Sequence, residues 1–394
     1  MVQLESYNDD VKLEHYTSAS RTYLGEQRKG ITDDHPNAST LRELVSEALS
    51  AKFFLAQKFP LPRSTSKSFT FLSQCFPKEI SRFWTAQLAD LQALVEQASR
   101  LEEEWRTLIP PATKPAAGHI NLSAFYSLMR DAQLGGSSWI RRFIFRFPLV
   151  GALSQNRAYP ADSRPPSHER LSPAELFASA RARFDERARK AGNKNAAALW
   201  QEACDQQTKG WLTPPFSLRF SSASSSCVIA DRKLNIAFRF GVKQAEKLRA
   251  CDDLKHSLTN LACSALTPIK LVSCGHVAEL SRRASSSPFD WDFIKADREA
   301  AYMQHPMRGE HAALAVIALK CPADHRRYGF FSRTWVFGAI AAVLRYNVFS
   351  RILAELTTFY LGIPLLSFFG DFGALVPSFL SSADLQTFTS FCPF

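Results

Sequence analysis

The sequence predicts an α+β fold, in which a mainly α N-terminal region precedes an antiparallel sheet with packed helices. Apolar residues recur at helical spacing between about residues 78 and 108. Further along, two short apolar runs each end in an aspartate, Asp297 and Asp371. With 394 residues, 46% of them hydrophobic and 22% charged, the chain can bury one large core or two moderate ones.

The chain is basic, with a formal net charge of +11. Residues 141–255 hold 21 Lys and Arg against 11 Asp and Glu, whereas residues 297–394 hold 8 against 7. A basic excess favours an anionic partner such as nucleic acid. Two interpretations fit this distribution. The cations could hold a nucleic-acid backbone, or they could form a solvated basic face.

Residues 1–39 are polar, and we expect a flexible tail there. A mainly helical N-terminal region is expected over residues 40–158. Its helices are predicted over residues 40–57, 78–108 and 121–131. Pro110 and Pro111 end the longest of them, because proline lacks the amide hydrogen and clashes with the preceding turn. Its apolar stripe is too short for a sustained coiled-coil seam, so a core-facing helix is the better interpretation.

Aromatic side chains and arginines interleave over residues 137–147. This pattern suits a groove for single-stranded nucleic acid, in which bases stack on rings and arginines meet phosphates. It also suits a half-buried strand with one basic face, and the strand is our prediction.

A proline-rich linker is predicted over residues 159–173, followed by a basic helical region over residues 174–235. Ser172 as N-cap, Pro173 at the first position and Glu175 in the first turn begin a helix that runs to Lys190. A second helix is predicted over residues 195–208.

The last part of the chain, residues 236–394, combines strands with one long helix. The predicted elements are strands over 289–296, 312–319 and 328–331, helices over 339–361 and 382–391, and a hairpin of 365–369 with 372–377. Gly370 and Asp371 lie at the tip of that hairpin. The apolar run of 352–369 contains Glu355 and Pro364, which favours a buried helix and strand over a membrane span.

Several classes of site lack support in the sequence. The 8 cysteines are scattered without a C-x-x-C pair, which argues against a zinc ribbon. No phosphate-binding glycine loop, dinucleotide-binding motif or serine nucleophile elbow occurs. The first 14 residues are polar rather than apolar, so we expect an intracellular protein, cytoplasmic or nuclear.

Two motifs resemble those of reverse transcriptases. Asp297-x-x-x-Ala301-Tyr302 is similar to the first palm motif, and the segment 368–371, Phe-Phe-Gly-Asp, is similar to the aromatic-x-Asp-Asp hairpin. The resemblance implies that Asp297 and Asp371 are catalytic ligands of Mg²⁺ or Mn²⁺, and that Tyr302 screens the nucleotide sugar. Gly370 stands where the family has its first hairpin aspartate, itself a metal ligand.

Upstream, residues 239–260 resemble the fingers of these enzymes, and residues 335–338 resemble a turn that packs near the template and nucleotide. The resemblance implies nucleotide contacts from a further set of residues: Lys247, Arg249, Phe337 and Gly338. An alternative for Arg249 is a surface ion pair with Asp252 or Asp253.

The resemblance covers about residues 239–391 and implies a right-hand polymerase with fingers and palm. Only three residues follow Phe391, so no thumb is expected unless a partner chain supplies one. The implied reaction is template-directed nucleotidyl transfer from a dNTP to a DNA primer 3′-hydroxyl on an RNA template. Gly370 predicts impaired or absent activity. The alternative is a non-catalytic nucleic-acid-binding or scaffold protein derived from a mobile element.

Overall fold

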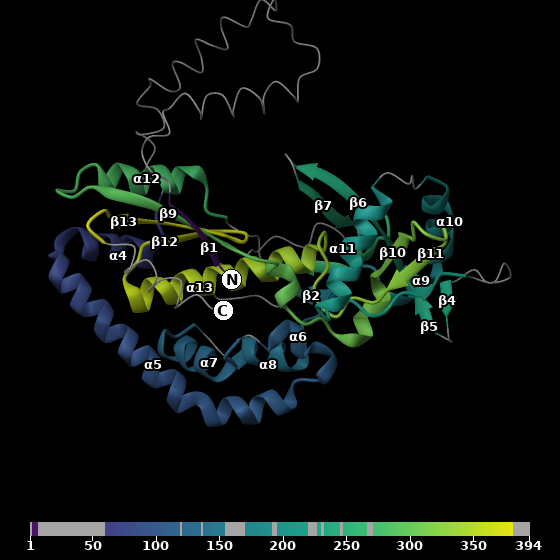
Figure 1. The fold of residues 1–394 in the computed structure, drawn as a ribbon, viewed down its shortest axis with the longest axis horizontal. Helices are drawn as coiled ribbons and strands as arrows, with labels where there is room; N and C mark the ends of the chain where they lie inside the picture. Colours follow the sequence, from purple (N-terminus) through teal and green to yellow (C-terminus); the bar gives the residue numbers. More distant parts are fainter. Residues whose placement is uncertain are drawn as a thin grey trace, which may run out of the picture.

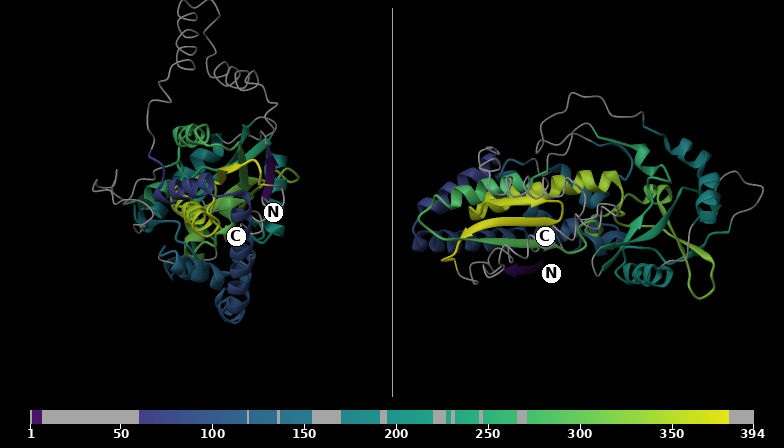
Figure 2. Two further views of the ribbon diagram at one scale, coloured as in Figure 1. Left: turned by 90° about the vertical axis from the view of Figure 1, so that its left-hand side faces the viewer. Right: turned by 90° about the horizontal axis from the view of Figure 1, so that it is seen from above.

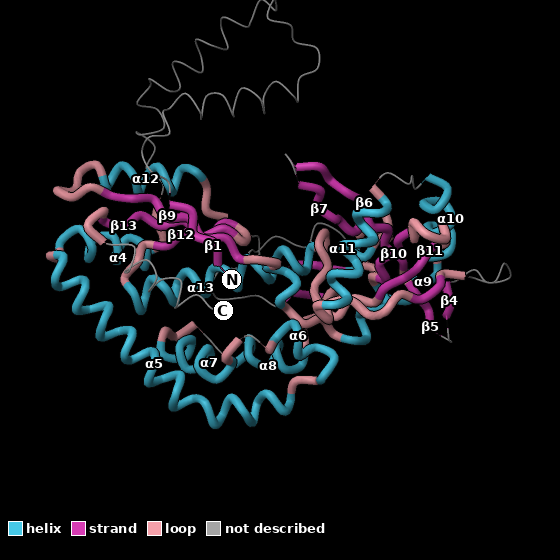
Figure 3. The backbone as a smooth tube through the Cα atoms, in the orientation of Figure 1, coloured by secondary structure: helices cyan, strands magenta, loops and turns pink. Residues whose placement is uncertain are grey.

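The structure is a computed structural model, and it describes most of the chain from residue 60 onward. The described residues are 2–6, 60–118, 120–134, 137–153, 170–190, 195–219, 227–229, 232–244, 247–265 and 271–380. They form a mixed α+β architecture of helices packed against two larger sheets (Figures 1 and 3). The helices expected over 40–57 and 382–391, and nearly all of the proline-rich linker, lie outside the described residues.

The described part of the N-terminal region is mainly helical. Its helices are α4 (Arg63–Gln74), α5 (Pro77–Leu108), α6 (Lys114–Ala117), α7 (Leu122–Asp131) and α8 (Ser137–Phe145), with the 3-10 turn η1 (Pro111–Thr113) before α6. The predictions for α5 and α7 are confirmed. In Figure 1, α5 runs along the lower margin of the molecule, with α7 and α8 beside it. Asn121 caps α7 by accepting a hydrogen bond from the Ala124 amide at 3.0 Å.

The prediction of a strand over residues 137–147 is wrong, because most of this segment is the helix α8. The pairs Trp139–Ile140 and Phe143–Ile144 are buried, whereas Arg141 is exposed. Buried pairs four residues apart follow a helical period of 3.6 and not a strand period of 2. Arg141 therefore lies on the outer face of a core helix, whereas Arg142 is partly buried.

The first sheet holds four strands in the order β1-β9-β13-β12, all antiparallel. They are β1 (Val2–Ser6), β9 (Trp291–Arg298), β13 (Asp371–Pro377) and β12 (Leu365–Phe368). We expected Val2–Ser6 within a flexible tail; instead its backbone pairs with the outer edge of β9. An open strand edge offers unpaired amide and carbonyl groups to any extended segment, whatever its side chains.

The second sheet holds five strands in the order β3-β11-β10-β6-β7. They are β3 (Phe216–Ser217), β11 (Arg327–Phe330), β10 (Val316–Lys320), β6 (Ile236–Gln244) and β7 (Lys247–Asp252). The strand expected from residue 312 begins only at Val316, because the 3-10 turn η4 (Gly309–Leu314) precedes it. Two small pairs complete the strands: β2 (Gly151–Leu153) with β8 (Cys263–Ala265), and β4 (Cys227–Ile229) with β5 (Arg232–Leu234).

Three helices accompany the second sheet: α9 (Pro173–Ala178), α10 (Ala180–Lys190) and α11 (Ala196–Thr208). The predicted start at Ser172 is confirmed, since its hydroxyl accepts from the Glu175 amide at 3.3 Å. Glu175 in turn accepts from the Ser172 amide at 2.6 Å, which completes a capping box. The single helix predicted to Lys190 is divided at Ser179 into α9 and α10.

The long helix α13 (Ile340–Leu361) packs beneath the first sheet and against α4, α5 and α7 (Figures 1 and 2). Its buried side chains occupy most of its circumference, as expected for a helix inside the core. Gly362 ends it in the left-handed conformation, with φ of +63°. No helix among the described residues combines the length and the apolar character needed to cross a membrane.

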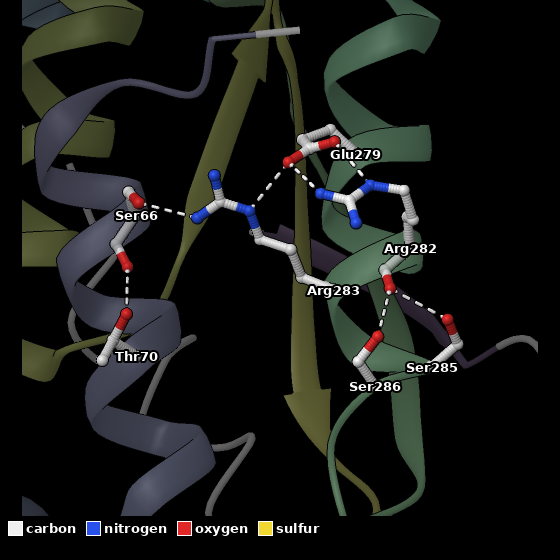
Figure 4. A network of polar contacts seen from close by, with 7 residues as sticks. All are labelled: Ser66, Thr70, Glu279, Arg282, Arg283, Ser285 and Ser286. Carbon is white, nitrogen blue, oxygen red and sulfur yellow. Dashed lines mark hydrogen bonds and ion pairs between the residues drawn. The ribbon is translucent and has the colours of Figure 1, made fainter. Parts of the chain in front are cut away.

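The helix α12 (Cys274–Ala284) is joined to α4 by a polar network (Figure 4). Glu279, with a side chain only 4% exposed, accepts from Arg282 and Arg283 at 2.8–2.9 Å. Arg283 also donates to the Ser66 hydroxyl of α4 at 2.7 Å. These hydrogen bonds lower the pKa of Glu279 to about 2. The carboxylate therefore stabilises the folded state as long as it is ionised.

Glu279→Gln is expected to lower the free energy of unfolding at pH 7 by about 1–2 kcal/mol, since the three hydrogen bonds from two partly exposed arginines lose their charge assistance. The pKa of Glu279 in the folded state lies below its ordinary value of 4.5. The stability difference between wild type and Glu279→Gln should therefore be largest above pH 4.5 and vanish as the pH falls toward about 2. Urea unfolding at several pH values measures both. Ser285→Ala, at the exposed end of the network, should change stability by less than about 0.5 kcal/mol.

Candidate active site

Asp297 and Asp371 lie directly opposite each other across β9 and β13. Opposed residues of an antiparallel pair project to the same face of the sheet, with Cβ atoms about 4.5–5.5 Å apart. The prediction that the two acidic motifs meet is therefore confirmed at the level of strand pairing. Asp371 is the first residue of β13, whereas Gly370 belongs to the turn before it.

The turn that presents Asp371 is fixed from two sides. The Ser350 hydroxyl of α13 donates to the Phe369 carbonyl at 2.6 Å, and the Arg298 amide of β9 donates to the Gly370 carbonyl at 3.1 Å. Phe369 itself has φ of +53°, in the left-handed region that large side chains rarely adopt. Hydrogen bonds from α13 and β9 thus hold a turn whose conformation is unfavourable for Phe369.

Strand alternation separates an open face from a buried one. Ile294 and Ala296 of β9 and Phe372 of β13 are buried in the main core, which also contains much of α13. Asp297 and Asp371 project to the other side. There Lys295 lies on the same face as Asp297, two residues earlier, and its ammonium nitrogen is 3.2 Å from an Asp371 oxygen.

The charges around Asp297 act in opposite directions. Desolvation and the neighbouring Asp371 carboxylate raise the pKa of Asp297 above its usual value, while the cations of Lys295 and Arg249 lower it. Two carboxylates held this close repel each other and attract a cation between them. The contribution of Arg249 also shows that the second sheet brings this guanidinium near the carboxylate pair.

Arg249 and Lys247 both lie on β7 of the β6–β7 hairpin, two residues apart and therefore on one face. The alternative ion pairs for Arg249 are wrong. Asp252 binds Arg239 at 2.8 Å, with both side chains essentially buried, and Asp253 lies 3.3 Å from Arg187. Asp252 and Asp253 thus form ion pairs at the open end of the hairpin. Lys247 and Arg249 lie closer to its tip, and both are exposed.

Tyr302 and Phe337 are brought together with an edge-to-face geometry, their ring centroids 5.8 Å apart. Tyr346 of α13 also packs against Tyr302, with ring centroids 5.1 Å apart. Burial and the Tyr346 phenol raise the pKa of Tyr302 to about 12. This tyrosine therefore stays neutral, and its ring is held between neighbouring aromatic side chains.

The backbone conformation at position 338 requires glycine. Its φ is +102°, and an added Cβ would lie 2.6 Å from the Asp252 carbonyl oxygen. Asn260 donates to the Gly338 carbonyl at 3.0 Å and accepts from the Ile340 amide, the first of α13, at 2.9 Å. The Asp252 amide also donates to the Phe337 carbonyl at 3.2 Å, so the turn before α13 is attached to the end of β7.

The structure adds residues that the motifs did not indicate: Lys295, Arg298, Tyr346 and Ser350. Of these, only Lys295 could have been predicted from the sequence, because a residue two positions before Asp297 on a strand lies on the same face. Tyr346 and Ser350 are four residues apart on α13 and so lie on one side of that helix. Their closeness to the hairpin depends on tertiary packing, which no local pattern reports.

The position of Gly370 has room for a side chain. An added Cβ would lie 3.6 Å from an Asp297 carboxylate oxygen, 3.7 Å from the Ala301 Cβ and 3.8 Å from the Tyr346 hydroxyl, all ordinary contacts. A carboxylate there would be a third ligand beside Asp297 and Asp371. In the described part of the chain, no three His, Cys, Asp or Glu side chains gather into a metal-binding group. The two carboxylates present fit one weakly held Mg²⁺ that keeps several waters.

Asp297→Asn is expected to leave stability at pH 7 unchanged or to raise it by less than about 1 kcal/mol, because the repelling carboxylate is solvent-screened. The folded pKa lies above the ordinary 3.8, so the native state binds more protons, and the wild-type protein loses stability as the pH rises through this window. Unfolding of both proteins at pH 3.5 and pH 7 tests this. Asp292→Asn on the same strand is the control, and a clear destabilisation by Asp297→Asn would assign Asp297 a structural role.

No model of a known protein family matches this chain, and no curated protein matches it significantly.

Proposed function

We propose that this chain is a reverse-transcriptase-like protein with a fingers-and-palm arrangement, whose capacity for nucleotidyl transfer from dNTP to a primer 3′-hydroxyl is impaired or lost. The observation that carries the proposal is the register of β9 and β13, which sets Asp297 opposite Asp371 on an open sheet face. The exposed cations of β7 and the packed rings of Tyr302 and Phe337 support the proposal, because an incoming nucleotide requires positive charge and a flat surface.

Each residue has a role that follows from its chemistry. Asp297 and Asp371 would hold Mg²⁺ or Mn²⁺, which when bound supplies charge neutralisation at the phosphates. Arg249 and Lys247 bind the triphosphate, since guanidinium and ammonium groups pair with phosphate oxygens. Tyr302, braced by Phe337 and Tyr346, lies under the sugar and restricts its position. Positioning and charge neutralisation supply most of the catalysis in phosphoryl transfer.

The impairment follows from Gly370 and Lys295. Without a carboxylate at position 370, one metal ligand is missing. Loss of about 4 kcal/mol of charge stabilisation lowers a rate roughly a thousandfold. Lys295 adds to this deficit, because its ammonium group already neutralises Asp371 at 3.2 Å and competes with a metal ion.

The same ion pair favours a second candidate function, a non-catalytic protein that binds nucleic acid or serves as a scaffold. In this case Lys295 replaces the metal as the partner of Asp371, and the basic face holds an RNA or DNA backbone without chemistry. Its affinity would fall steeply with salt but would not depend on Mg²⁺.

Primer extension separates the two candidates. We expect Gly370→Asp to extend a DNA primer on an RNA template at least about tenfold faster than wild type with Mg²⁺ or Mn²⁺, because the third carboxylate restores metal binding. Asp297→Ala in that background should abolish the gain, and Gly370→Asn, of equal size but uncharged, is the matched control.

Mn²⁺ affinity, followed by electron paramagnetic resonance, gives a second readout that does not depend on primer binding. Gly370→Asp should bind Mn²⁺ more tightly than wild type or Gly370→Asn. If neither extension nor Mn²⁺ affinity changes, the carboxylate pair is not a metal site and the scaffold function is the better one.

A further inference from the structure

A cavity of about 540 Å³ lies away from the carboxylate pair, where the N-terminal helical region meets the second sheet. Its walls come from η1, α9, β5, η4 and the segment after β11, and it shares no residue with the candidate active site. Cavities of this size accommodate small-molecule ligands.

The charge of the cavity is strongly unbalanced. Its lining includes four cations and a single carboxylate. The cations are Arg146, Arg232, Lys233 and Arg333. The carboxylate, Glu310, is mostly exposed and lies 3.9 Å from Arg308, which is not part of the lining. Among the residues that the structure describes, none of the four cations forms an ion pair. Clustered cations without acidic partners repel one another and are stabilised by an anion.

Arg146 is set into this cavity by the backbone. It follows the last residue of α8 and has φ of +69°, the left-handed conformation that commonly ends a helix. Its guanidinium lies across Gly309, where an added Cβ would be 2.9 Å from the terminal nitrogen. Gly309 thus permits the close approach, and Arg333 is oriented by a hydrogen bond to the Gly210 carbonyl at 3.4 Å.

Apart from the charged side chains and the hydroxyls of Thr113, Thr213 and Ser332, the lining is apolar. Phe177, Met307 and Phe331 contribute partly or fully buried apolar surface. The hydroxyls of Thr113 and Ser332 donate to the carbonyls of Pro110 and Thr334 within the walls, so they are already engaged. A bare inorganic anion would leave this apolar surface unfilled.

We propose that this cavity binds a small phosphorylated molecule with a flat apolar part, of the size and chemistry of a nucleoside diphosphate. The four cations hold the phosphates, arginine being suited to bidentate contact with their oxygens. The aromatic and methionine side chains contact the apolar part. This site is independent of the proposed polymerase chemistry.

Calorimetric titration of the full chain with ADP in EDTA tests the proposal, because removal of divalent metal suppresses nucleotide binding at the carboxylate pair. Arg232→Gln/Lys233→Gln is the principal variant, since both side chains are exposed and their loss leaves the core intact. Lys78→Gln/Arg82→Gln on α5 removes the same charge from exposed positions elsewhere. Arg249→Gln tests the contribution of the other proposed nucleotide site.

We expect saturable ADP binding, weakened roughly tenfold or more in Arg232→Gln/Lys233→Gln and changed less than about twofold in the two control variants. Adenosine and inorganic phosphate should each bind more weakly than ADP. The proposal is overturned by absence of ADP binding, by equal loss in the α5 control, or by loss in Arg249→Gln alone. It is also overturned if the principal variant weakens only a single-stranded oligonucleotide and not ADP.

Discussion

The antiparallel register of β9 and β13 is the constraint on which the candidate active site depends. Asp371 faces Asp297, and the pairing continues to the opposed Pro377 and Trp291. A slip of one residue would turn one aspartate toward the core, because successive side chains point to opposite faces. Burial of Ile294, Ala296 and Phe372 on the other face opposes that slip, so the apolar core beneath the sheet determines which carboxylates meet above it.

The charges at the site come from both sheets, and their positions have a common origin. The buried pair of Arg239 and Asp252 fixes the base of the β6–β7 hairpin, from which Arg249 acts on Asp297. The Asp252 amide also donates to the Phe337 carbonyl in the turn before α13, and Ser350 of α13 holds the turn before Asp371. The positions of the carboxylates and of the cations thus depend on one connected set of polar contacts.

Much of the fold could be predicted because its signals are local. Helical spacing and the prolines defined α5, and the apolar run with Gly362 defined α13. The meeting of Asp297 and Asp371 was implied by the resemblance of their two motifs to those of a known family. The α8 segment was mispredicted because interleaved aromatics and arginines fit both a helical and a strand period. Only the packing of the segment against the core selects the helix. The contacts of Lys295, Tyr346 and Ser350 depend on strand register and helix docking, and the cationic cavity joins segments far apart in the chain.

The left-handed Phe369 implies that the position of Asp371 is determined from outside the hairpin. A two-residue hairpin turn normally gains its stability from glycine or asparagine at such a position. Here a bulky aromatic occupies it, so the residues of the turn contribute little to its stability. The Ser350 hydroxyl of α13 and the Arg298 amide of β9 hold the turn instead. A substitution that shifts α13 against the sheet would therefore displace Asp371 even if the hairpin sequence is unchanged.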